Sequence, residues 1–249
     1  MTISSRSAAL VAAITGPLLL AVSFAQPPDG PSLLTATAPQ IQAYARSQVD
    51  ALRLGALAAL VSIALLLAFT AAVTAILRAA SPRSMLPDLY AGGSYLLLGA
   101  FFLAAVAGGL PANLPDLAGG DSPSPEMLIA WHGIAGFAHL AGDFQIVFIA
   151  VLTGAFSLAA WRTRVVARWV SVLGAVVAAA AAAGTVGVTL NSSILYGFWF
   201  GGMFGWVLWL PITGVALAVR TRTGRRRAPR QAAEAAVPGP MDRERDAAI

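Results

Sequence analysis

The chain lacks cysteine and is poor in charged residues. Neither cysteine nor lysine occurs among its 249 residues, so all 16 basic residues are arginine. Without cysteine the protein can form no disulfide, no thiolate zinc site, no cysteine-ligated iron–sulfur cluster and no cysteine nucleophile. Charged residues make up 11% of the chain, whereas soluble domains usually carry about 25%. This composition favours a membrane protein over a soluble domain.

The chain is rich in long apolar segments. Hydrophobic residues make up 58% of the chain, and its mean hydropathy is +0.76. A helix of roughly 20 apolar residues crosses the hydrocarbon core of a bilayer. The runs are continuously apolar, whereas barrel strands alternate over about ten residues. We therefore expect an all-α integral membrane protein, a six-transmembrane-helix bundle within residues 1–220, with spans at about 8–25, 54–77, 90–110, 140–160, 170–190 and 198–219.

The arginines predict the orientation of the chain. Cytoplasmic loops are enriched in lysine and arginine. With six spans and both ends on one side, 14 arginines share that side, while two, Arg46 and Arg53, lie on the other. Both termini are therefore expected in the cytoplasm, and the protein in the cell membrane.

The N-terminus allows two interpretations. Arg6, the apolar run after it and the small residues before Gln26 resemble a secretory signal peptide. Cleavage would leave five spans and an external N-terminus. The apolar run is long for a signal peptide, so a retained first span is the favoured interpretation.

Two external connectors follow from this topology. In the first, Pro39 to Arg53 predicts a helix that leads into the second span, either as an interfacial helix over the bundle or as a lid over an external cavity. The second, PANLPDLAGGDSPSP, predicts a loop that carries Asp116 and Asp121 in solvent.

Residues 221–249 form a tail that is first basic and then mixed in charge. The tail lacks apolar periodicity, which predicts a disordered cytoplasmic segment. It also lacks interleaved aromatic residues and a folded module, so nucleic acid is not an expected partner. Arginines beside a span anchor its topology and suit anionic lipid headgroups. Membrane lipids are thus the expected partners, with candidate headgroup contacts at Arg220, Arg222, Arg225, Arg226 and Arg227.

Small residues predict how the last two spans pack. Gly197, Gly201 and Gly205 recur every four residues and form one smooth strip, and residues 175–187 are small almost all round. Small residues let helix backbones approach in lipid. We expect these spans to pack closely, or one of them to face an identical partner in a homodimer. Pro211 should kink the last span.

One cluster of polar residues is expected inside the membrane or close to its outer surface. His132 and His139 are the two histidines of the chain, and Asp143 is the only acid placed inside a span. At 100° per residue they fall within a sector of about 40° on one helix face. An intramembrane acid is a functional-site hypothesis. The alternative is structural: Asp143 caps a helix start after Gly142, or bonds His139 one turn back.

Spacing limits what this cluster can do. The two histidines are about 10 Å apart along a helix, so they cannot share one metal ion or haem iron. His139 and Asp143 could supply two ligands, with others from Asn113, Asp116, Asp121 or Asn191. Serine hydrolysis would need a nucleophile beside His139, with Ser94, Ser192 and Ser193 as candidates. No motif marks either arrangement, so no metal or cofactor is assigned.

The connector RTRVVARWVSVLGAV resembles part of a known family. It contains a basic turn, an Arg-Trp pair at Arg168 and Trp169, and Gly174 in the span that follows. With the six-span layout and the helical first connector, the chain resembles the bacterial multi-pass membrane family named domain of unknown function 4386. The resemblance implies the six-span layout. It implies no activity and no functional residues.

Three functions remain open. The first is a non-enzymatic scaffold, regulator or partner-binding membrane protein, favoured by the absence of a catalytic motif. The second is a small proton-linked carrier that uses Asp143 and His139. Its weakness is that spans two and five offer few polar groups, and no inverted repeat is seen. The third is a metal-dependent membrane hydrolase around His132, His139 and Asp143.

Overall fold

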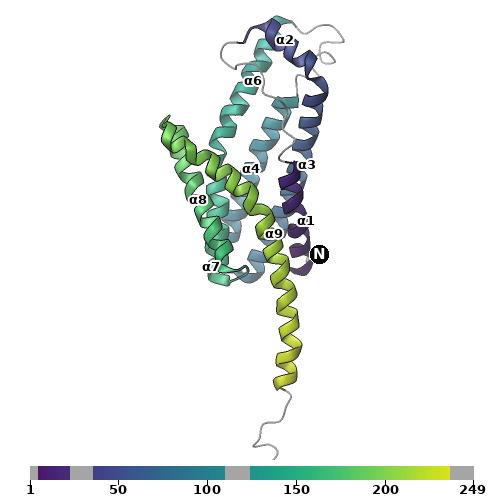
Figure 1. Cartoon of the computed structure of the whole chain (residues 1–249), viewed down its shortest axis with the longest axis vertical. Helices are drawn as coiled ribbons and strands as arrows, with labels where there is room; N and C mark the ends of the chain where they lie inside the picture. Colours follow the sequence, from purple (N-terminus) through teal and green to yellow (C-terminus); the bar gives the residue numbers. More distant parts are fainter. Residues whose placement is uncertain (1–4, 23–35, 110–123, 236–249) are drawn as a thin grey trace, which may run out of the picture.

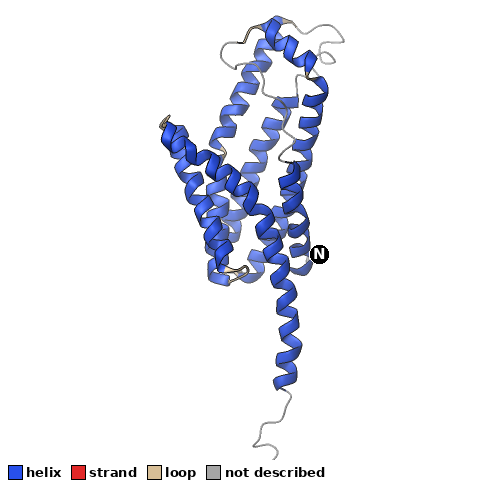
Figure 2. Ribbon diagram, in the orientation of Figure 1, coloured by secondary structure: helices blue, strands red, loops and turns tan. Residues whose placement is uncertain are grey.

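The computed structural model describes residues 5–22, 36–109 and 124–235, and every regular element in these ranges is a helix (Figure 2). The helices are α1 (Ser5–Val22), α2 (Ala38–Ser47), α3 (Val49–Ala80), α4 (Leu86–Gly109), α6 (Pro125–Phe144), α7 (Ile146–Thr163), α8 (Arg168–Thr189) and α9 (Ser193–Ala235). The expectation of an all-helical chain is confirmed for these residues.

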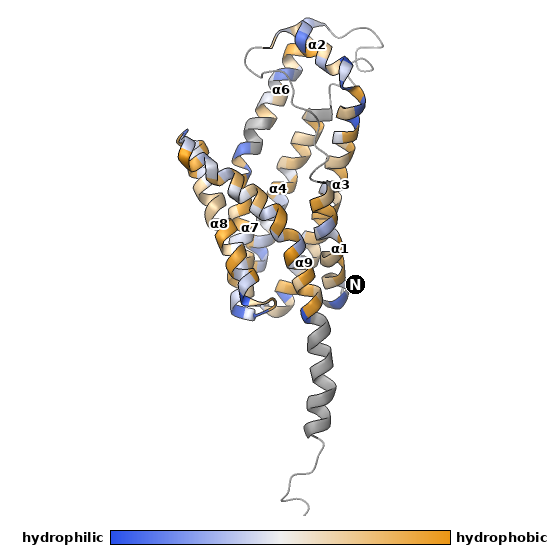
Figure 3. Ribbon diagram, viewed as in Figure 1, coloured by the Kyte–Doolittle hydropathy of each residue, from blue (hydrophilic) through white to orange (hydrophobic). Residues whose placement is uncertain are grey.

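Five helices, α3, α4, α7, α8 and α9, are long and apolar enough to cross a membrane. The apolar part of α1, Arg6–Ala21, is shorter. Hydrophilic residues gather mainly at the two ends of the bundle, and apolar residues fill the stretch between them (Figure 3). The described helices are therefore compatible with membrane insertion, and α1 is the one helix of the six-span layout that falls short in length.

Six helices close into a ring. Around the bundle, α1 packs against α3, α3 against α4, α4 against α7, α7 against α8, α8 against α9, and α9 returns to α1 (Figure 1). Large side chains fill the inside, including the fully buried Phe69, Phe156 and Trp209. Trp209 meets Phe156 edge to face with ring centroids 4.9 Å apart. Since lipid tails are as apolar as these side chains, close packing rather than burial from water favours this association.

The expected fourth span, 140–160, is divided between two helices. Helix α6 ends at Phe144 and α7 begins at Ile146. At the junction the Phe148 N–H donates to the Gln145 carbonyl over three residues at 2.9 Å, which tightens the first turn of α7. The Gln145 side chain is buried, and its Oε1 has no hydrogen-bond partner among the described residues. The break was not predicted because no proline interrupts the sequence between residues 140 and 160.

The predicted helix before the second span is present. Thr37 precedes α2, and its N–H donates to the Gln40 Oε1 at 2.9 Å. After α2 the chain turns at Gln48 and continues as α3. Helix α2 lies across one end of the molecule (Figure 1), where Ile41 packs with Leu128 and Trp131 of α6. This contact makes α2 a cover for α6 in the described structure.

Helix α9 extends further than expected. Residues 221–249 were predicted to be disordered, but α9 continues to Ala235, and residues 236–249 lie outside the described residues. Nine of the fifteen residues from 221 to 235 are arginine or alanine, which favour helix, whereas Gly224 and Pro229 do not. Composition alone therefore understated the helix in this segment.

Helix α9 also changes neighbours along its length. Before Pro211 it lies on α8: a Cβ added at Gly184 would be 2.6 Å from the Trp199 Cα, and one added at Gly202 would be 2.8 Å from the Ala181 Cα. From there on it lies on α1, where a Cβ on Gly16 would be 2.8 Å from the Leu210 carbonyl oxygen. Figure 1 shows α9 bending within the bundle. The predicted kink at Pro211 agrees with this change of direction.

Candidate functional site

Asp143 lies in the last turn of α6, half-buried, beside the break between α6 and α7. Its backbone carbonyl accepts a hydrogen bond from the Trp199 indole Nε1 at 3.1 Å. Its carboxyl group lies close enough to the Tyr196 side chain to interact with it electrostatically. Asp143 is therefore held by two aromatic residues of α9 from outside its own helix.

Tyr196 and Trp199 form a stacked aromatic pair at the start of α9. Their rings stack with centroids 5.9 Å apart, and Trp199 meets Phe200 edge to face at 5.1 Å. Gly184 lets the Trp199 backbone approach α8, because any larger residue would collide with it. The three-residue spacing of Tyr196 and Trp199 was the available signal, but it does not reveal which helix they face.

The three residues of the predicted polar cluster all belong to α6, and the structure describes the side chains of two of them, His132 and Asp143. His132 is buried, with 7% of its surface exposed, and its ring lies 5.8 Å from that of Trp131. The Trp131 Nε1 donates to the Ala107 carbonyl at 3.0 Å, which fixes α6 against α4. His132 and Asp143 are separated by about 16 Å along α6. The His139 backbone belongs to α6, and its side chain lies outside the described part of the structure.

The candidate metal ligands whose side chains the structure describes do not meet at one point. No group of three His, Asp or Glu side chains meets at one point among those that the structure describes. Asn113, Asp116 and Asp121 lie outside the described residues. Asn191 is exposed in the turn between α8 and α9, with a φ of 50° in the left-handed region. This conformation accounts for asparagine in the turn.

One of the three serine candidates lies inside the bundle. Ser94 is buried and donates to the Tyr90 carbonyl of its own helix at 2.8 Å. Ser192 precedes α9, and Ser193 is its first residue. The Ser94 hydroxyl is therefore bonded within α4.

The sequence analysis missed a set of buried polar groups inside the ring. Their side chains have no hydrogen-bond partner among the described residues. They come from four helices: Thr74 of α3, Ser157 of α7, Ser171 of α8, and Trp209 and Thr213 of α9. The Ser157 Oγ and the Trp209 Nε1 both approach Gly174. Serine and threonine in an apolar helix can face lipid, a neighbour or their own backbone, so the sequence does not distinguish these cases.

The glycine strip takes part in packing at one of its three positions. A Cβ on Gly205 would meet the Val177 side chain at 3.0 Å, whereas one on Gly197 or Gly201 would meet nothing within 4 Å. Helices α8 and α9 do pack closely, as predicted, but through Gly184, Gly187 and Gly202 together with Gly205. The homodimer through Gly197 and Gly201 stays a prediction.

The end of the bundle opposite α2 carries most of the described arginines, and we call it the arginine end. Its exposed arginines are Arg6, Arg78, Arg83, Arg162, Arg164, Arg168 and Arg220. Arg78 pairs with Asp88 at 2.7 Å, and the Arg168 guanidinium lies 5.6 Å from the centre of the Trp161 ring. The side chains of Arg222, Arg225, Arg226 and Arg227 lie outside the described residues. This end is therefore strongly positive.

The α2 end carries an acid at the start of α6. Hydrogen bonds from the Glu126 backbone and then the Ser124 side chain lower the pKa of the exposed Glu126 carboxyl. A negative charge there also favours the N-terminus of α6.

Comparisons with known proteins give no relative: no family model, curated protein or solved structure matches the chain. The resemblance to domain of unknown function 4386 therefore stays a prediction.

Proposed function

We propose that this protein is a non-enzymatic, multi-pass membrane protein that binds a protein partner through the exposed apolar face of α6. The observation that supports the proposal is the exposure of three large apolar side chains on that face. Ile129, Ile134 and Phe137 are 58%, 54% and 71% exposed. They lie within about 140° of one another around the helix, so they form one surface. Gly133 lies between them with open space around it.

The level of α6 in the molecule supports a protein partner rather than lipid. Helix α8 has 22 residues, or about 33 Å, which matches a hydrocarbon core of about 30 Å. Asp143 contacts Trp199, whose backbone lies against Gly184 near the end of α8. From Asp143, α6 runs about 27 Å further to Pro125, whereas α8 runs only about 8 Å beyond Gly184. Figure 1 shows α6 and α2 extending past the end of α8.

The exposed face of α6 suits a protein interface. By the same measure Ile129 and Ile134 lie beyond the end of α8, and Phe137 lies about level with it. Exposed contiguous apolar surface is typical of protein interaction sites. The opposite side of α6 is already used, since Leu128 and Trp131 pack with Ile41 of α2. A partner that covers the exposed side would bury Phe137, and aromatic residues are enriched at the centres of such interfaces.

The test is purification of the full chain from its own membranes in a mild detergent, with Phe137→Ser compared with Phe204→Ser. Phe204 is equally large and 61% exposed, but it lies on α9 within the bundle. We expect a protein that co-purifies with the unchanged chain and with Phe204→Ser, and that is lost with Phe137→Ser. Identical co-purifying proteins in all three preparations would reject the proposal.

A second candidate function is a small proton-linked carrier. It is favoured by Asp143, a half-buried acid at a helix break in contact with Tyr196, because broken helices and intramembrane acids recur in carriers. The fully buried Phe69, Phe156 and Trp209 inside the ring weigh against it. Its test is proton flux into proteoliposomes. Flux that Asp143→Asn abolishes would support the carrier, and flux equal to that of empty vesicles would remove it.

A further inference from the structure

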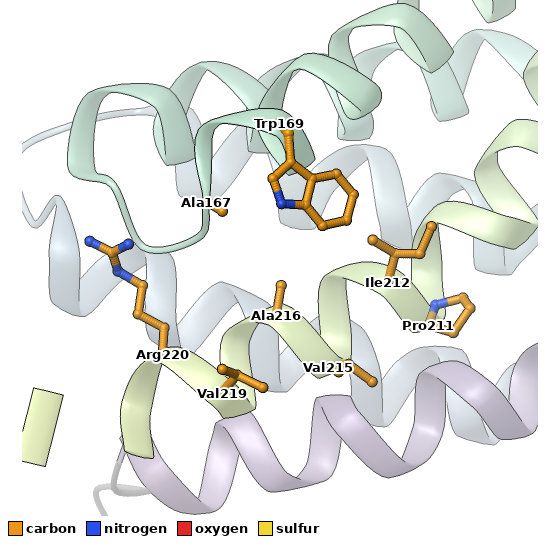
Figure 4. Close-up of a pocket in the computed structure, with 8 residues that line it drawn as sticks. All are labelled: Ala167, Trp169, Pro211, Ile212, Val215, Ala216, Val219 and Arg220. Carbon is orange, nitrogen blue, oxygen red and sulfur yellow. The ribbon is translucent and has the colours of Figure 1, made fainter. Parts of the chain in front are cut away.

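A lipid-facing groove runs along the arginine end between α8 and α9 (Figure 4). Its volume is about 620 Å³. One wall is formed by Ala167 and Trp169 at the start of α8, and the other by the face of α9 from Pro211 to Arg220. Figure 4 shows Pro211 at one end of this surface and Arg220 at the other.

The groove exists because α9 leaves α8 at this point. Trp209 is the last α9 residue seen at close approach to α8, where its Nε1 would lie 2.8 Å from a Cβ on Gly174. Beyond Pro211, Gly214 lies against the backbone of Ala12 in α1. As α9 turns toward α1, the first turn of α8 loses its neighbour, and Trp169 is left exposed beside the gap.

The chemistry of the lining is that of a phospholipid site. Of the residues that line the groove, Arg220 alone is charged, and the rest are apolar. Pro211 and Arg220 are nine residues apart, or about 13 Å, which is close to half of a hydrocarbon core of about 30 Å. An apolar channel as long as one leaflet, with a guanidinium at its end, suits one acyl chain below an anionic phosphate. Trp169 belongs to a residue type enriched at the headgroup level.

We propose that this groove binds one anionic phospholipid, with an acyl chain between Trp169 and Val215 and the phosphate at Arg220. The site goes beyond the proposed function and does not depend on it, because α6 lies at the other end of the molecule. Charge complementarity selects the ligand: the arginine end carries seven exposed arginines, and the acid described there, Asp88, pairs with Arg78. A guanidinium binds phosphate through paired N–H donors.

The first experiment measures lipid binding to the full chain by native mass spectrometry in detergent, with phosphatidylglycerol and phosphatidylcholine added in turn. We expect one phosphatidylglycerol to bind more tightly than phosphatidylcholine. Arg220→Ala should weaken phosphatidylglycerol about fivefold, the effect of one arginine near an anionic headgroup. Arg83→Ala is the matched control, because Arg83 is exposed at the same end, between α3 and α4. Equal weakening by both variants would mean diffuse surface charge and would overturn the site.

A second pair of variants tests the groove itself. Ala216 lines the groove, whereas Ala175 is exposed on α8 and is not part of the groove lining. Ala216→Trp should displace the bound phosphatidylglycerol, and Ala175→Trp should leave it bound. Retention in both variants would overturn the proposal, as would a chain that carries no lipid and has the mass of a dimer, since a second copy would then cover the groove. Should Ala216→Trp fail to fold, the arginine pair still decides.

Discussion

The two halves of α9 meet their neighbours in different ways. The first half lies directly on α8 because Gly184, Gly187 and Gly202 remove the side chains that would separate the backbones. The second half, after Pro211, leaves α8, crosses α1 at Gly214, and opens a groove beside Trp169. The comparison teaches that the positions of the glycines determine where α8 and α9 pack in direct contact. The position of Pro211 determines where the two helices separate and leave a groove that faces lipid.

The largest effect is expected from a substitution in the first half of the α8–α9 contact, where the two backbones lie close together. A Cβ on Gly187 would lie 2.5 Å from the Tyr196 backbone nitrogen, so Gly187→Ala must push α9 away from α8. Overpacking of this kind costs about 1–3 kcal/mol. Gly201→Ala is the matched control, because a Cβ there meets nothing within 4 Å, and alanine favours helix over glycine by about 1 kcal/mol. Thermal unfolding in detergent should show a clear loss for Gly187→Ala alone, and equal stability of the two variants would contradict the packing described.

The second effect concerns the hydrogen bond that joins α9 to the end of α6. Trp199→Phe removes the indole hydrogen bond to the Asp143 carbonyl, at a cost of about 1 kcal/mol. Trp206→Phe makes the same ring change where the Nε1 has no partner among the described residues. Hydrogen exchange should accelerate around residues 143–148 in Trp199→Phe and stay unchanged there in Trp206→Phe. Unchanged exchange in both variants would show that this bond does not hold the junction.

A smaller effect concerns the polar groups inside the ring. The Ser157 hydroxyl is buried without a partner among the described residues, whereas the Thr153 hydroxyl donates to the Ile149 carbonyl at 2.6 Å. Ser157→Ala should therefore leave stability unchanged or raise it slightly, and Thr153→Val should lower it by about 1 kcal/mol. Melting temperatures of the two variants measure the difference. A marked loss on Ser157→Ala would instead point to a bound water or ligand at this hydroxyl.

The smallest effect is a pH dependence at the far end of α6. The pKa of Glu126 lies below its ordinary value of 4.5 because the ionised carboxyl accepts hydrogen bonds. Its contribution to stability is therefore present above pH 4.5 and is lost as the pH falls through the lowered pKa. Hydrogen exchange in the first turn of α6 should speed up over that range in the native chain. Glu126→Gln should remove the pH dependence, and an identical profile in both proteins would rule out this carboxyl as its cause.

Much of the fold could be predicted from the sequence, because long apolar runs have few alternatives in a membrane. A helix was also expected from Pro39 to Arg53; α2 covers its first part, and a turn at Gln48 separates α2 from α3, which contains the rest. The break at Gln145 was missed, since a buried glutamine within an apolar run leaves no distinct signal. The helix through Ala235 was missed because the segment lacks an apolar face and contains Gly224 and Pro229, although most of its residues are arginine or alanine, which favour helix.

The candidate site was predicted less well, because face and depth are set by neighbours that the sequence does not identify. Four-residue spacing correctly marked α9 as a packing helix, but its contact face runs through Gly202 and Gly205 rather than Gly197 and Gly201. Asp143 was identified as notable, whereas its contacts with Tyr196 and Trp199 join residues more than 50 positions apart. No local pattern connects such residues.

The most direct test of the account is photocrosslinking at α6 in intact membranes. A photoreactive phenylalanine replaces Phe137 on the exposed face of α6 or, as the control, Val176 on the exposed face of α8. We predict a discrete protein adduct from position 137 and lipid adducts alone from position 176. Lipid adducts alone from both positions would place the α6 face in the bilayer and contradict the claim that it binds a protein partner.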